Sequence, residues 1–403
     1  MVLIIGSGAG GGILGLELAK ANIPVTIVEK GPLIDSKDAF DYYNDPVDGM
    51  DLLSTTCVGG NTVVSAGNGV RSCEDMLADY GIDLSEEYDE IEKQINIHQM
   101  DDSHIGRGTQ LFIDSAKELG LNVSKMPKFI YEDKCIQCGK CAYGCPNNAK
   151  WTSADFVKEA VDNGAKLLSN SPVTNVLVED NKVVGIEITK EDGKTETIKD
   201  DLVVLCAGAV TDARLLQKLG IPAGQQFTTD PFVSVGAVIK GIGFNKEVTM
   251  NALVKGEHFV LAPHYSSKYL DSRAADDNLK PEDILSIMVK IPDEGLGYVN
   301  ADEVVKYNSI RDVQYLAEGA ATAGAILQNA GAESVFVSTV FRSAHPGGTA
   351  PIGTIVDSNL KTKIEGLYVS DGSVFPRAPG APPILAILAI SKRLSKHLIN
   401  KLQ

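Results

Sequence analysis

The sequence predicts an α/β fold, in which parallel strands alternate with helices. Three observations indicate it: the chain opens on an apolar run at residues 2–5, a glycine-rich turn leads into an apolar helical stretch, and a second strand-like run covers residues 24–28. A chain of 403 residues with 44% hydrophobic and 22% charged content suffices for two domains, or for one large domain that carries an insertion.

The turn after the first strand has the pattern GxGxxG at residues 6–11. Gly6 permits the tight turn, Gly8 lets the backbone approach a pyrophosphate, and Gly11 lets the helix pack closely on the strand. The start of the helix supplies free N–H groups and the positive end of its dipole. Glu29 follows the second strand, where a carboxylate accepts the hydroxyls of a ribose. This order of strand, glycines, helix, second strand and acid predicts a dinucleotide site. By itself it does not distinguish FAD from NAD as the ligand.

A second motif is a run of four cysteines followed by a proline. Cys135, Cys138, Cys141 and Cys145 precede Pro146 with the spacing Cys-x2-Cys-x2-Cys-x3-Cys-Pro. Bacterial ferredoxins hold iron–sulfur clusters with this spacing, because thiolates are soft ligands and the short loop wraps one corner of a cubane. We therefore predict a 4Fe–4S cluster on these cysteines.

The fourth ligand and the metal itself have alternatives at this stage. In ferredoxins with two clusters the fourth cysteine of such a run binds the other cluster, and this chain has one run. The fourth ligand is then Cys145 or a distant thiol, Cys57 or Cys73. A zinc site with four cysteine ligands is the second interpretation, although such sites more often use two separated knuckles. A third is that the thiols are packed or paired and bind no metal.

The C-terminal sequence resembles a known flavoprotein family. Residues 345–353 read His-Pro-Gly-Gly-Thr-Ala-Pro-Ile-Gly, residues 366–376 read Gly-Leu-Tyr-Val-Ser-Asp-Gly-Ser-Val-Phe-Pro, and a closing helix begins near Pro383. This order resembles the closing part of the glucose–methanol–choline (GMC) flavoprotein oxidoreductases, including their cholesterol-oxidase-like branch. Residues 205–209 are similar to the strand and turn by which that family returns to its FAD domain.

The resemblance implies noncovalently bound FAD. It further implies a discontinuous Rossmann-type FAD-binding domain with an inserted, mainly antiparallel-sheet substrate domain. Residues 58–61 resemble the glycine turn beside the flavin ring, and residues 148–150 (Asn-Ala-Lys) recur in the cholesterol-oxidase-like branch. The expected cofactor contacts are Gly6, Gly8, Gly11, Glu29, Gly59, Gly60, Asn61, Ala207, Gly208 and Asp371.

The same resemblance implies that His345 is the active-site base. Such a histidine takes the hydroxyl proton of an alcohol while a hydride leaves its carbon for the flavin. The second active-site position of the family, normally His or Asn, falls on Pro382, which has neither a side-chain donor nor an N–H. Either His345 works alone, another residue replaces the partner, or the substrate is not a simple alcohol. The replacements considered are His258, His264, Tyr265 and Asn251.

The motifs divide the chain into five expected segments. The FAD-binding domain takes residues 1–75, 151–225 and 341–403; the inserted region with the cysteine loop takes 76–150; and the substrate domain takes 226–340. Helices are expected near residues 85–95, 154–165 and 313–329, and paired strands within 173–188.

The charge and the termini restrict the partners. The formal net charge of −16 argues against nucleic acid and against an anionic membrane surface, which both need a basic face. The apolar stretch at residues 384–390 is too short to span a bilayer, and the start of the chain has no basic n-region. We expect a cytoplasmic protein without a membrane span.

These features predict an FAD-dependent dehydrogenase or reductase. It would move a hydride between an alcohol or carbonyl small molecule and FAD, and pass single electrons through the cluster to or from a ferredoxin-like carrier or partner subunit. One alternative is a cluster-free alcohol or sterol oxidase that uses oxygen. The other is an electron-transfer subunit with FAD and a cluster but no substrate of its own, an interpretation that Pro382 keeps open.

Overall fold

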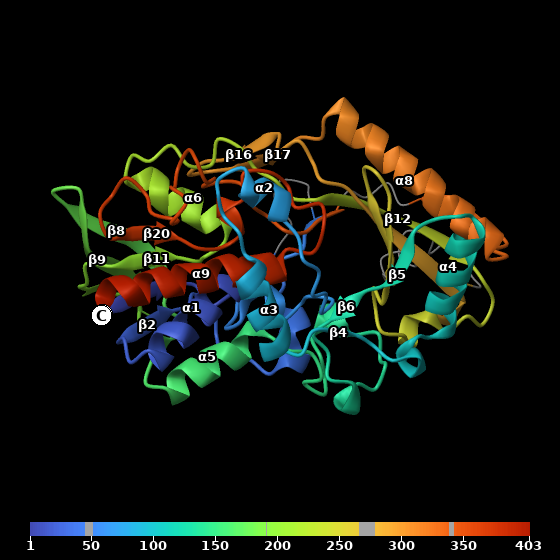
Figure 1. Ribbon diagram of the computed structural model, residues 1–403, viewed down its shortest axis with the longest axis horizontal. Coiled ribbons are helices and arrows are strands. Elements are labelled where there is room, and N and C mark those ends of the chain that lie inside the picture. Colours follow the sequence, from blue (N-terminus) through green and yellow to red (C-terminus); the bar gives the residue numbers. More distant parts are fainter. Residues whose placement is uncertain (45–50, 191, 266–278, 338–341) are drawn as a thin grey trace.

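A computed structural model describes residues 1–44, 51–190, 192–265, 279–337 and 342–403. Figure 1 shows two halves side by side. One half contains a parallel sheet and the two chain ends, and the other is built on a larger, mainly antiparallel sheet. This mixed architecture is the α/β fold expected from the sequence. The segment boundary expected at residues 340 and 341 lies outside the described residues.

The parallel sheet has five strands in the order β20-β11-β1-β2-β7. Their side chains are mostly aliphatic and, in the three central strands, buried throughout, as befits a parallel sheet covered on both faces. Ile4 of β1 pairs with Val204 on one side and with Ile27 on the other. The strands are β1 (Val2–Ile5), β2 (Val25–Val28), β7 (Lys166–Leu168), β11 (Val203–Leu205) and β20 (Leu367–Val369).

Helices cover this sheet on both faces. Helix α1 (Ala9–Lys20) packs between α5 (Ser153–Asp162) and α9 (Ile384–Leu402), and α6 (Ala209–Lys218) lies on the opposite face (Figure 1). The glycines at the start of α1 make this close packing possible, because a Cβ at Gly10 would lie 1.9 Å from the carbonyl oxygen of Ser370. Helix α3 (Ser85–Gln94) packs against α9 from outside.

Beside α6 lies a three-stranded antiparallel sheet in the order β10-β9-β8. Strands β8 (Val173–Glu179) and β9 (Lys182–Thr189) are joined by Asp180 and Asn181, both at positive φ, which is the geometry of a two-residue hairpin turn. Strand β10 (Thr195–Ile198) completes the sheet.

The second half is built on an eight-stranded sheet with the order β3-β19-β12-β15-β14-β13-β5, to which β18 adds by pairing with β12. Its longest pairing joins β12 and β15 from Phe232–Lys290 to Val238–Ile284. Strands from outside residues 226–340 join this sheet, namely β3, β5 and β19. The strands are β3 (Asp51–Leu52), β5 (Val123–Lys125), β12 (Pro231–Val238), β13 (Ala252–Lys255), β14 (Val260–Pro263), β15 (Ile284–Lys290), β18 (Val335–Val337) and β19 (Arg342–Ser343).

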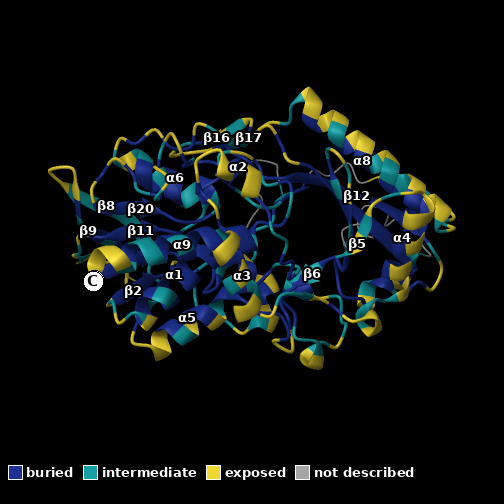
Figure 2. Ribbon diagram, viewed as in Figure 1, coloured by how far each residue is buried: buried dark blue, intermediate teal, exposed yellow. Residues whose placement is uncertain are grey.

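Helices α8 (Ile310–Asn329) and α4 (Arg107–Glu118) pack on one face of this sheet and bury a second core, whereas their outer faces are exposed (Figure 2). The short elements are α2 (Glu74–Ala78), β4 (His98–Gln99), β6 (Pro127–Lys128), β16 (Gly297–Val299) and β17 (Val304–Lys306).

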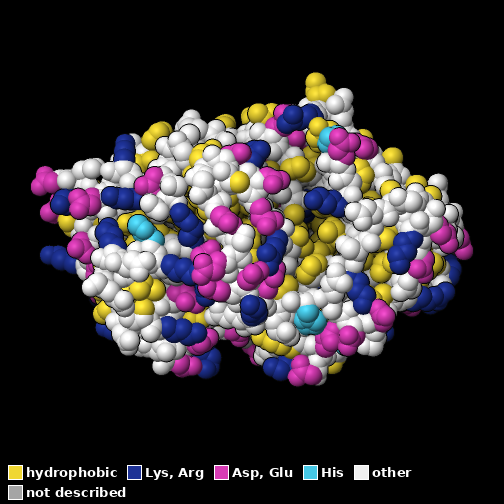
Figure 3. Space-filling view, in the orientation of Figure 1, with side chains coloured by type: hydrophobic (Ala, Val, Ile, Leu, Met, Phe, Trp, Pro, Cys, Tyr) yellow, Lys and Arg dark blue, Asp and Glu magenta, His cyan; other side chains and the backbone are white. Residues whose placement is uncertain are grey.

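The surface mixes charges of both signs. On the face seen in Figure 3, Lys and Arg side chains are interspersed with Asp and Glu, and hydrophobic side chains line the hollow between the two halves. Within the described residues, no helix combines the length and the apolar character needed to cross a membrane.

Candidate active site and cysteine pocket

The dinucleotide fingerprint lies at the carboxyl ends of the parallel strands, where α/β sheets bind ligands. A Cβ at Gly8 would meet no atom within 4 Å, and the same is true of Gly208, which precedes α6. Both glycines therefore border open space next to the start of a helix. Gly6, at φ +99°, and Gly11 have the structural roles expected of them, because added Cβ atoms would lie 2.2 Å from the carbonyl oxygen of Cys206 and 2.0 Å from that of Gly6.

The glycine turn at residues 59–61 contacts this fingerprint. The N–H of Gly59 donates to Oγ of Ser7 at 3.1 Å, and a Cβ at Gly60 would lie 3.1 Å from Cα of Gly8. The side chain of Asn61 accepts from the N–H of Thr55 and so shapes the turn from its outer side. We call the open space bordered by Gly8, Gly60 and Gly208 the dinucleotide cradle.

Glu29 is buried at the end of β2. Its Oε2 accepts hydrogen bonds from the N–H and the Oγ of Ser7, and its Oε1 accepts from the N–H of Gly31 at 2.8 Å. Burial raises the pKa of Glu29, and these hydrogen bonds oppose the shift. Because each carboxylate oxygen has two acceptor sites, Oε1 keeps one for a ribose hydroxyl. The residue therefore fits the expected contact with the cofactor.

Two carboxylates hold the turn before α6. Asp371 accepts from the N–H of Gly208 at 2.7 Å, and Asp212 accepts from the N–H of Ala207 at 3.1 Å. Burial, and then the nearby charge of Asp371, raise the pKa of Asp212 well above its ordinary value. The structure thus brings Ala207, Gly208 and Asp371 together beside the dinucleotide cradle. Sequence reasoning missed Asp212, since an acid in the first turn of a helix is common and gives no specific signal.

The cradle has the features that FAD requires. It offers two helix starts for the pyrophosphate, glycines that leave room for it, and a buried carboxylate for the ribose.

His345 is held by a buried carboxylate, that of Asp230. Its Nδ1 lies 2.9 Å from Oδ2 of Asp230, whose side chain has no exposed surface, while 19% of the histidine side chain remains exposed. The other oxygen of Asp230 accepts from the N–H of Gly380 at 2.9 Å. Asp230 therefore links the histidine to the loop that contains Pro382. The carbonyl oxygen of Pro382 itself accepts from Oγ of Ser72.

A buried lysine, Lys290, completes this group. Its Nζ lies 3.1 Å from Nδ1 and 3.2 Å from Nε2 of His345. Burial lowers the pKa of Lys290 and raises that of Asp230, and the attraction between the two opposes both shifts. Burial and the charge of Lys290 hold the pKa of His345 well below its usual value, so the imidazole is neutral.

The replacements considered for Pro382 do not include this lysine. His258 stacks on the ring of Tyr315 in α8, and Asn251 donates to the carbonyl oxygen of His104. His264 lies edge-on to Phe232, and Tyr265 packs against the core under α8. In the sequence, Lys290 could have been noticed as one charged residue at the end of an otherwise apolar strand. No pattern in the sequence marked Asp230.

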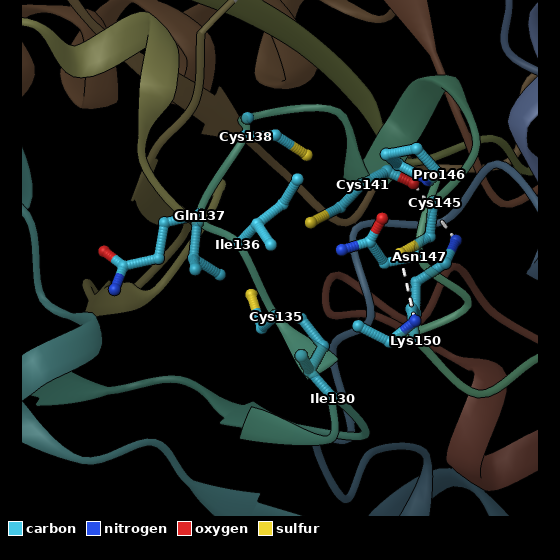
Figure 4. A pocket seen from close by; sticks show the side chains of 13 residues that line it. Ile130, Cys135, Ile136, Gln137, Cys138, Cys141, Cys145, Pro146, Asn147 and Lys150 are labelled. Atoms are coloured by element: carbon cyan, nitrogen blue, oxygen red, sulfur yellow. Dashed lines mark hydrogen bonds between the residues drawn. The ribbon is translucent and has the colours of Figure 1, made fainter. Parts of the chain in front are cut away.

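The four cysteines of the ferredoxin-like run surround one cavity (Figure 4). Their sulfur atoms point toward one another, and the space between them measures about 350 Å³ including its open side. Apolar side chains line much of the rest, together with the polar Gln137, Asn147 and Lys150, and the N–H of Ala149 donates to Sγ of Cys145 at 3.2 Å. We call this cavity the cysteine pocket. Its apolar lining is formed by Ile130, Ile136, Pro146, Ala149 and Val248.

The distant thiols considered as a fourth ligand lie elsewhere. Cys57 packs with Ala39 and Val63, and Cys73 belongs to the core around the parallel sheet. Cys145, in contrast, lines the cysteine pocket. Within the described residues, all seven cysteines are free, and no three Cys, His, Asp or Glu side chains converge closely enough for a single metal ion.

Two buried lysines, Lys150 and Lys128, lie beside the cysteine pocket. Nζ of Lys150 donates to the carbonyl oxygen of Cys141 and to three carbonyl oxygens that directly follow the glycine turn, those of Thr62, Val63 and Ser65. Nζ of Lys128 donates to the carbonyl oxygens of Ala66 and Thr249 and to the side chain of Asn68. Burial lowers the pKa of Lys150 to about 8 and that of Lys128 to about 7, and nearby cysteines oppose both shifts.

Comparisons with known proteins agree with this geometry. Residues 50–247 and 297–391 match the N-terminal and C-terminal family models of the GMC oxidoreductases. An uncharacterised protein of Methanocaldococcus jannaschii is 32% identical over 98% of this chain and 99% of its own length. A long-chain-alcohol oxidase of Arabidopsis thaliana, FAO4B, is 24% identical over 100% of this chain and 67% of its own.

Solved structures show the same fold. Pyridoxine 4-oxidase from Mesorbium loti superposes with a TM-score of 0.74 at 17% identity, covering 98% of both chains. A variant of Aspergillus oryzae formate oxidase superposes with a TM-score of 0.76 at 16% identity, covering 100% of this chain and 98% of that one. From the matched family and the dinucleotide cradle together, we conclude that the chain belongs to the GMC oxidoreductases and is an FAD-dependent oxidoreductase.

Proposed function

We propose that this protein moves a hydride between an alcohol or carbonyl small molecule and FAD, and passes single electrons through a 4Fe–4S cluster. The observation that carries the second part is the cysteine pocket, in which four thiols of ferredoxin spacing face one cavity. The long-chain-alcohol oxidases among the similar proteins support an alcohol as the substrate class. The cholesterol-oxidase-like branch remains a prediction.

His345 is the proposed base at the substrate. FAD, when bound, supplies a two-electron acceptor for the hydride. The neutral imidazole of His345, held through Nδ1 by Asp230, presents Nε2 to the hydroxyl proton of the alcohol. The proposed cofactor contacts are the residues that border or support the dinucleotide cradle, namely Gly6, Gly8, Gly11, Glu29, Gly59, Gly60, Asn61, Ala207, Gly208 and Asp371.

The proposed ligands of the cluster are Cys135, Cys138, Cys141 and Cys145. All four line one cavity, and the ferredoxin spacing of the run is what supports a cluster there. The N–H of Ala149 offers the hydrogen bond to sulfur that tunes such clusters. The ammonium groups of Lys128 and Lys150 offset the negative charge of four thiolates in a buried site.

The position of the pocket supports a relay. Lys150 connects Cys141 to the backbone that follows the glycine turn, so a cluster there would lie next to the dinucleotide cradle. On its other side the cysteine loop reaches the surface, where the side chain of Ile136 is 61% exposed. A ferredoxin-like carrier or a partner subunit would exchange electrons at this surface.

The proposed domain division follows the two sheets. Strands from residues 1–75, 151–225 and 341–403 build the parallel sheet, which supports a discontinuous FAD-binding domain. Most strands of the larger sheet come from residues 226–340, which supports a substrate domain there, with the cysteine loop in the region 76–150.

The decisive measurement is the content of iron and acid-labile sulfide per FAD in anaerobically purified protein. About four irons and four sulfides per flavin are expected, with a broad visible absorption that dithionite bleaches. The variant Cys145→Ala should lose this iron, whereas the matched variant Cys73→Ala should retain it. Iron-free protein from a strictly anaerobic preparation would disprove the cluster.

A cluster-free oxidase is the second candidate, because the named relatives and structures are oxidases. Fast formation of hydrogen peroxide from alcohols by iron-free protein would favour it. A third outcome is flavin reduction by dithionite-reduced ferredoxin without any response to a panel of alcohols and aldehydes, and this would indicate an electron-transfer subunit instead.

A further inference from the structure

Lys290 is an unusual residue for its position. It ends β15, whose other residues are apolar apart from Ser286, and only 3% of its surface is exposed. A buried ammonium group loses its hydration and persists only where a partner or a function compensates. Its Nζ lies within 3.2 Å of both ring nitrogens of His345. The lysine is therefore part of the group around the proposed base.

The backbone holds this group in a strained conformation. Asp230 has φ +47° and His345 has φ +61°, in the left-handed region that costs free energy for residues other than glycine. Two such residues in direct hydrogen-bond contact place the carboxylate and the imidazole with respect to each other. Strain of this kind concentrates at functional sites.

The loop with Pro382 supplies no polar side chain to the site. Its Gly380 N–H binds Asp230, and the carbonyl oxygen of Pro382 accepts from Ser72. A proton taken up by a base has to pass on to water or to a second polar group before the next turnover. In this structure Lys290 is the polar side chain nearest to His345 after Asp230.

We propose that Lys290, paired with Asp230, replaces the side chain that Pro382 lacks and receives the substrate proton from His345. The inference rests on the proposed alcohol oxidation. In this oxidation the C–H bond of the alcohol would break with its electron pair, for which FAD, when bound, would supply the acceptor, and a C=O bond would form. The O–H bond breaks, and its proton passes to Nε2 of His345 and from there to the neutral amine of Lys290, where Asp230 balances the new positive charge.

The titration of the group supports this direction of transfer. Burial is the larger cause of the lowered pKa of His345 and acts on it also when Lys290 is neutral, so the imidazole does not keep the proton. Burial lowers the pKa of Lys290 to about 8, so the neutral amine that accepts the proton becomes the main form as the pH rises through that value. The other charged or titratable groups that interact electrostatically with Lys290, Asp230 or their neighbours are Cys73, Lys128, His264, Asp293, Lys306 and Arg342.

Three variants test the proposal. Lys290→Met removes the acceptor, and Lys290→Arg keeps the charge but has no accessible neutral form. Lys392→Met is the matched control, because Lys392 is buried and ion-paired with Glu17 far along α9. Flavin reduction is followed anaerobically by stopped flow with benzyl alcohol and with 1-octanol, between pH 6 and 9.

We expect both Lys290 variants to reduce the flavin about 100-fold more slowly at saturating alcohol, with little change in KM. The wild-type rate of flavin reduction should rise as the pH increases through the pKa of Lys290. Both Lys290 variants should lack this rise. The control should keep the rate and the profile. A Lys290→Met or Lys290→Arg protein with FAD bound and an unchanged pH profile would overturn the proposal.

A second readout does not depend on turnover. In protein with ¹⁵N-labelled histidine, the pKa of His345 should rise in Lys290→Met, because the charge of Lys290 is the second cause of its depression, with the resonance assigned by His345→Asn. An unchanged pKa refutes the coupling between the two residues. The wild type could fail to oxidise any alcohol while the pKa of His345 still rises in Lys290→Met. That result would refute the proposed substrate class and leave the coupling between Lys290 and His345 established.

Discussion

Lys150 connects the cysteine loop to the backbone after the glycine turn, and its removal gives a sharp prediction. In Lys150→Met the aliphatic part of the side chain is nearly conserved, but four carbonyl oxygens at 2.7 to 3.1 Å lose this contact, and among the described residues only that of Thr62 keeps a donor, in Ser65. An orphaned buried carbonyl costs about 1 kcal/mol or more. We therefore expect the free energy of unfolding to fall by about 3 kcal/mol.

Urea unfolding followed by circular dichroism measures this loss, and gel filtration followed by an absorption spectrum measures the FAD that remains bound. Both should fall, because the lysine supports the turn beside the dinucleotide cradle. Lys158→Met is the control: this lysine is exposed on α5 and pairs only with Asp162, so its variant should behave as the wild type. A loss below about 1 kcal/mol in Lys150→Met, with unchanged FAD content, would refute the reasoning.

Three further predictions concern the cradle and a buried histidine. Gly8→Leu should unfold at the same temperature as the wild-type apoprotein but lose FAD, as measured by flavin fluorescence, because its side chain fills open space. Gly11→Ala should lower the melting temperature of the apoprotein itself, because its Cβ would lie 2.0 Å from the carbonyl oxygen of Gly6. The folded protein holds the pKa of His264 at about 4 through burial, so the unfolded chain binds the proton first as the pH falls below about 6.5. Stability should thus drop by about 2 kcal/mol from pH 7 to pH 5, and urea unfolding of His264→Phe should lack this part of the drop.

The sequence allowed the dinucleotide cradle to be predicted because its parts are local. A strand, its glycine turn, a helix and the acid after the next strand lie within the first 29 residues, and each has a fixed geometry. Residue 345 was predicted from a resemblance alone, and the structure adds what surrounds it. The cysteine spacing likewise led to the prediction of a metal site, but only the fold shows that Cys145 lines the cysteine pocket while Cys57 and Cys73 lie elsewhere.

Asp230 and Lys290 were not predictable by the same reasoning. They are separated from His345 by 115 and 55 residues, and their approach depends on the register between β12 and β15. That register is set by contacts of two whole strands, which no short motif records. The entry of β3 and β5 into the larger sheet escaped prediction for a related reason, since strands of two or three residues have too little periodicity to detect.

The strand order of the parallel sheet has a consequence for biosynthesis. Strand β1 leaves the ribosome long before β20, which flanks its neighbour β11, and long before α9, which covers α1. The first helix of the nascent chain therefore keeps an apolar face uncovered until α9 has been made. Until then this face is a site at which the nascent chain can aggregate.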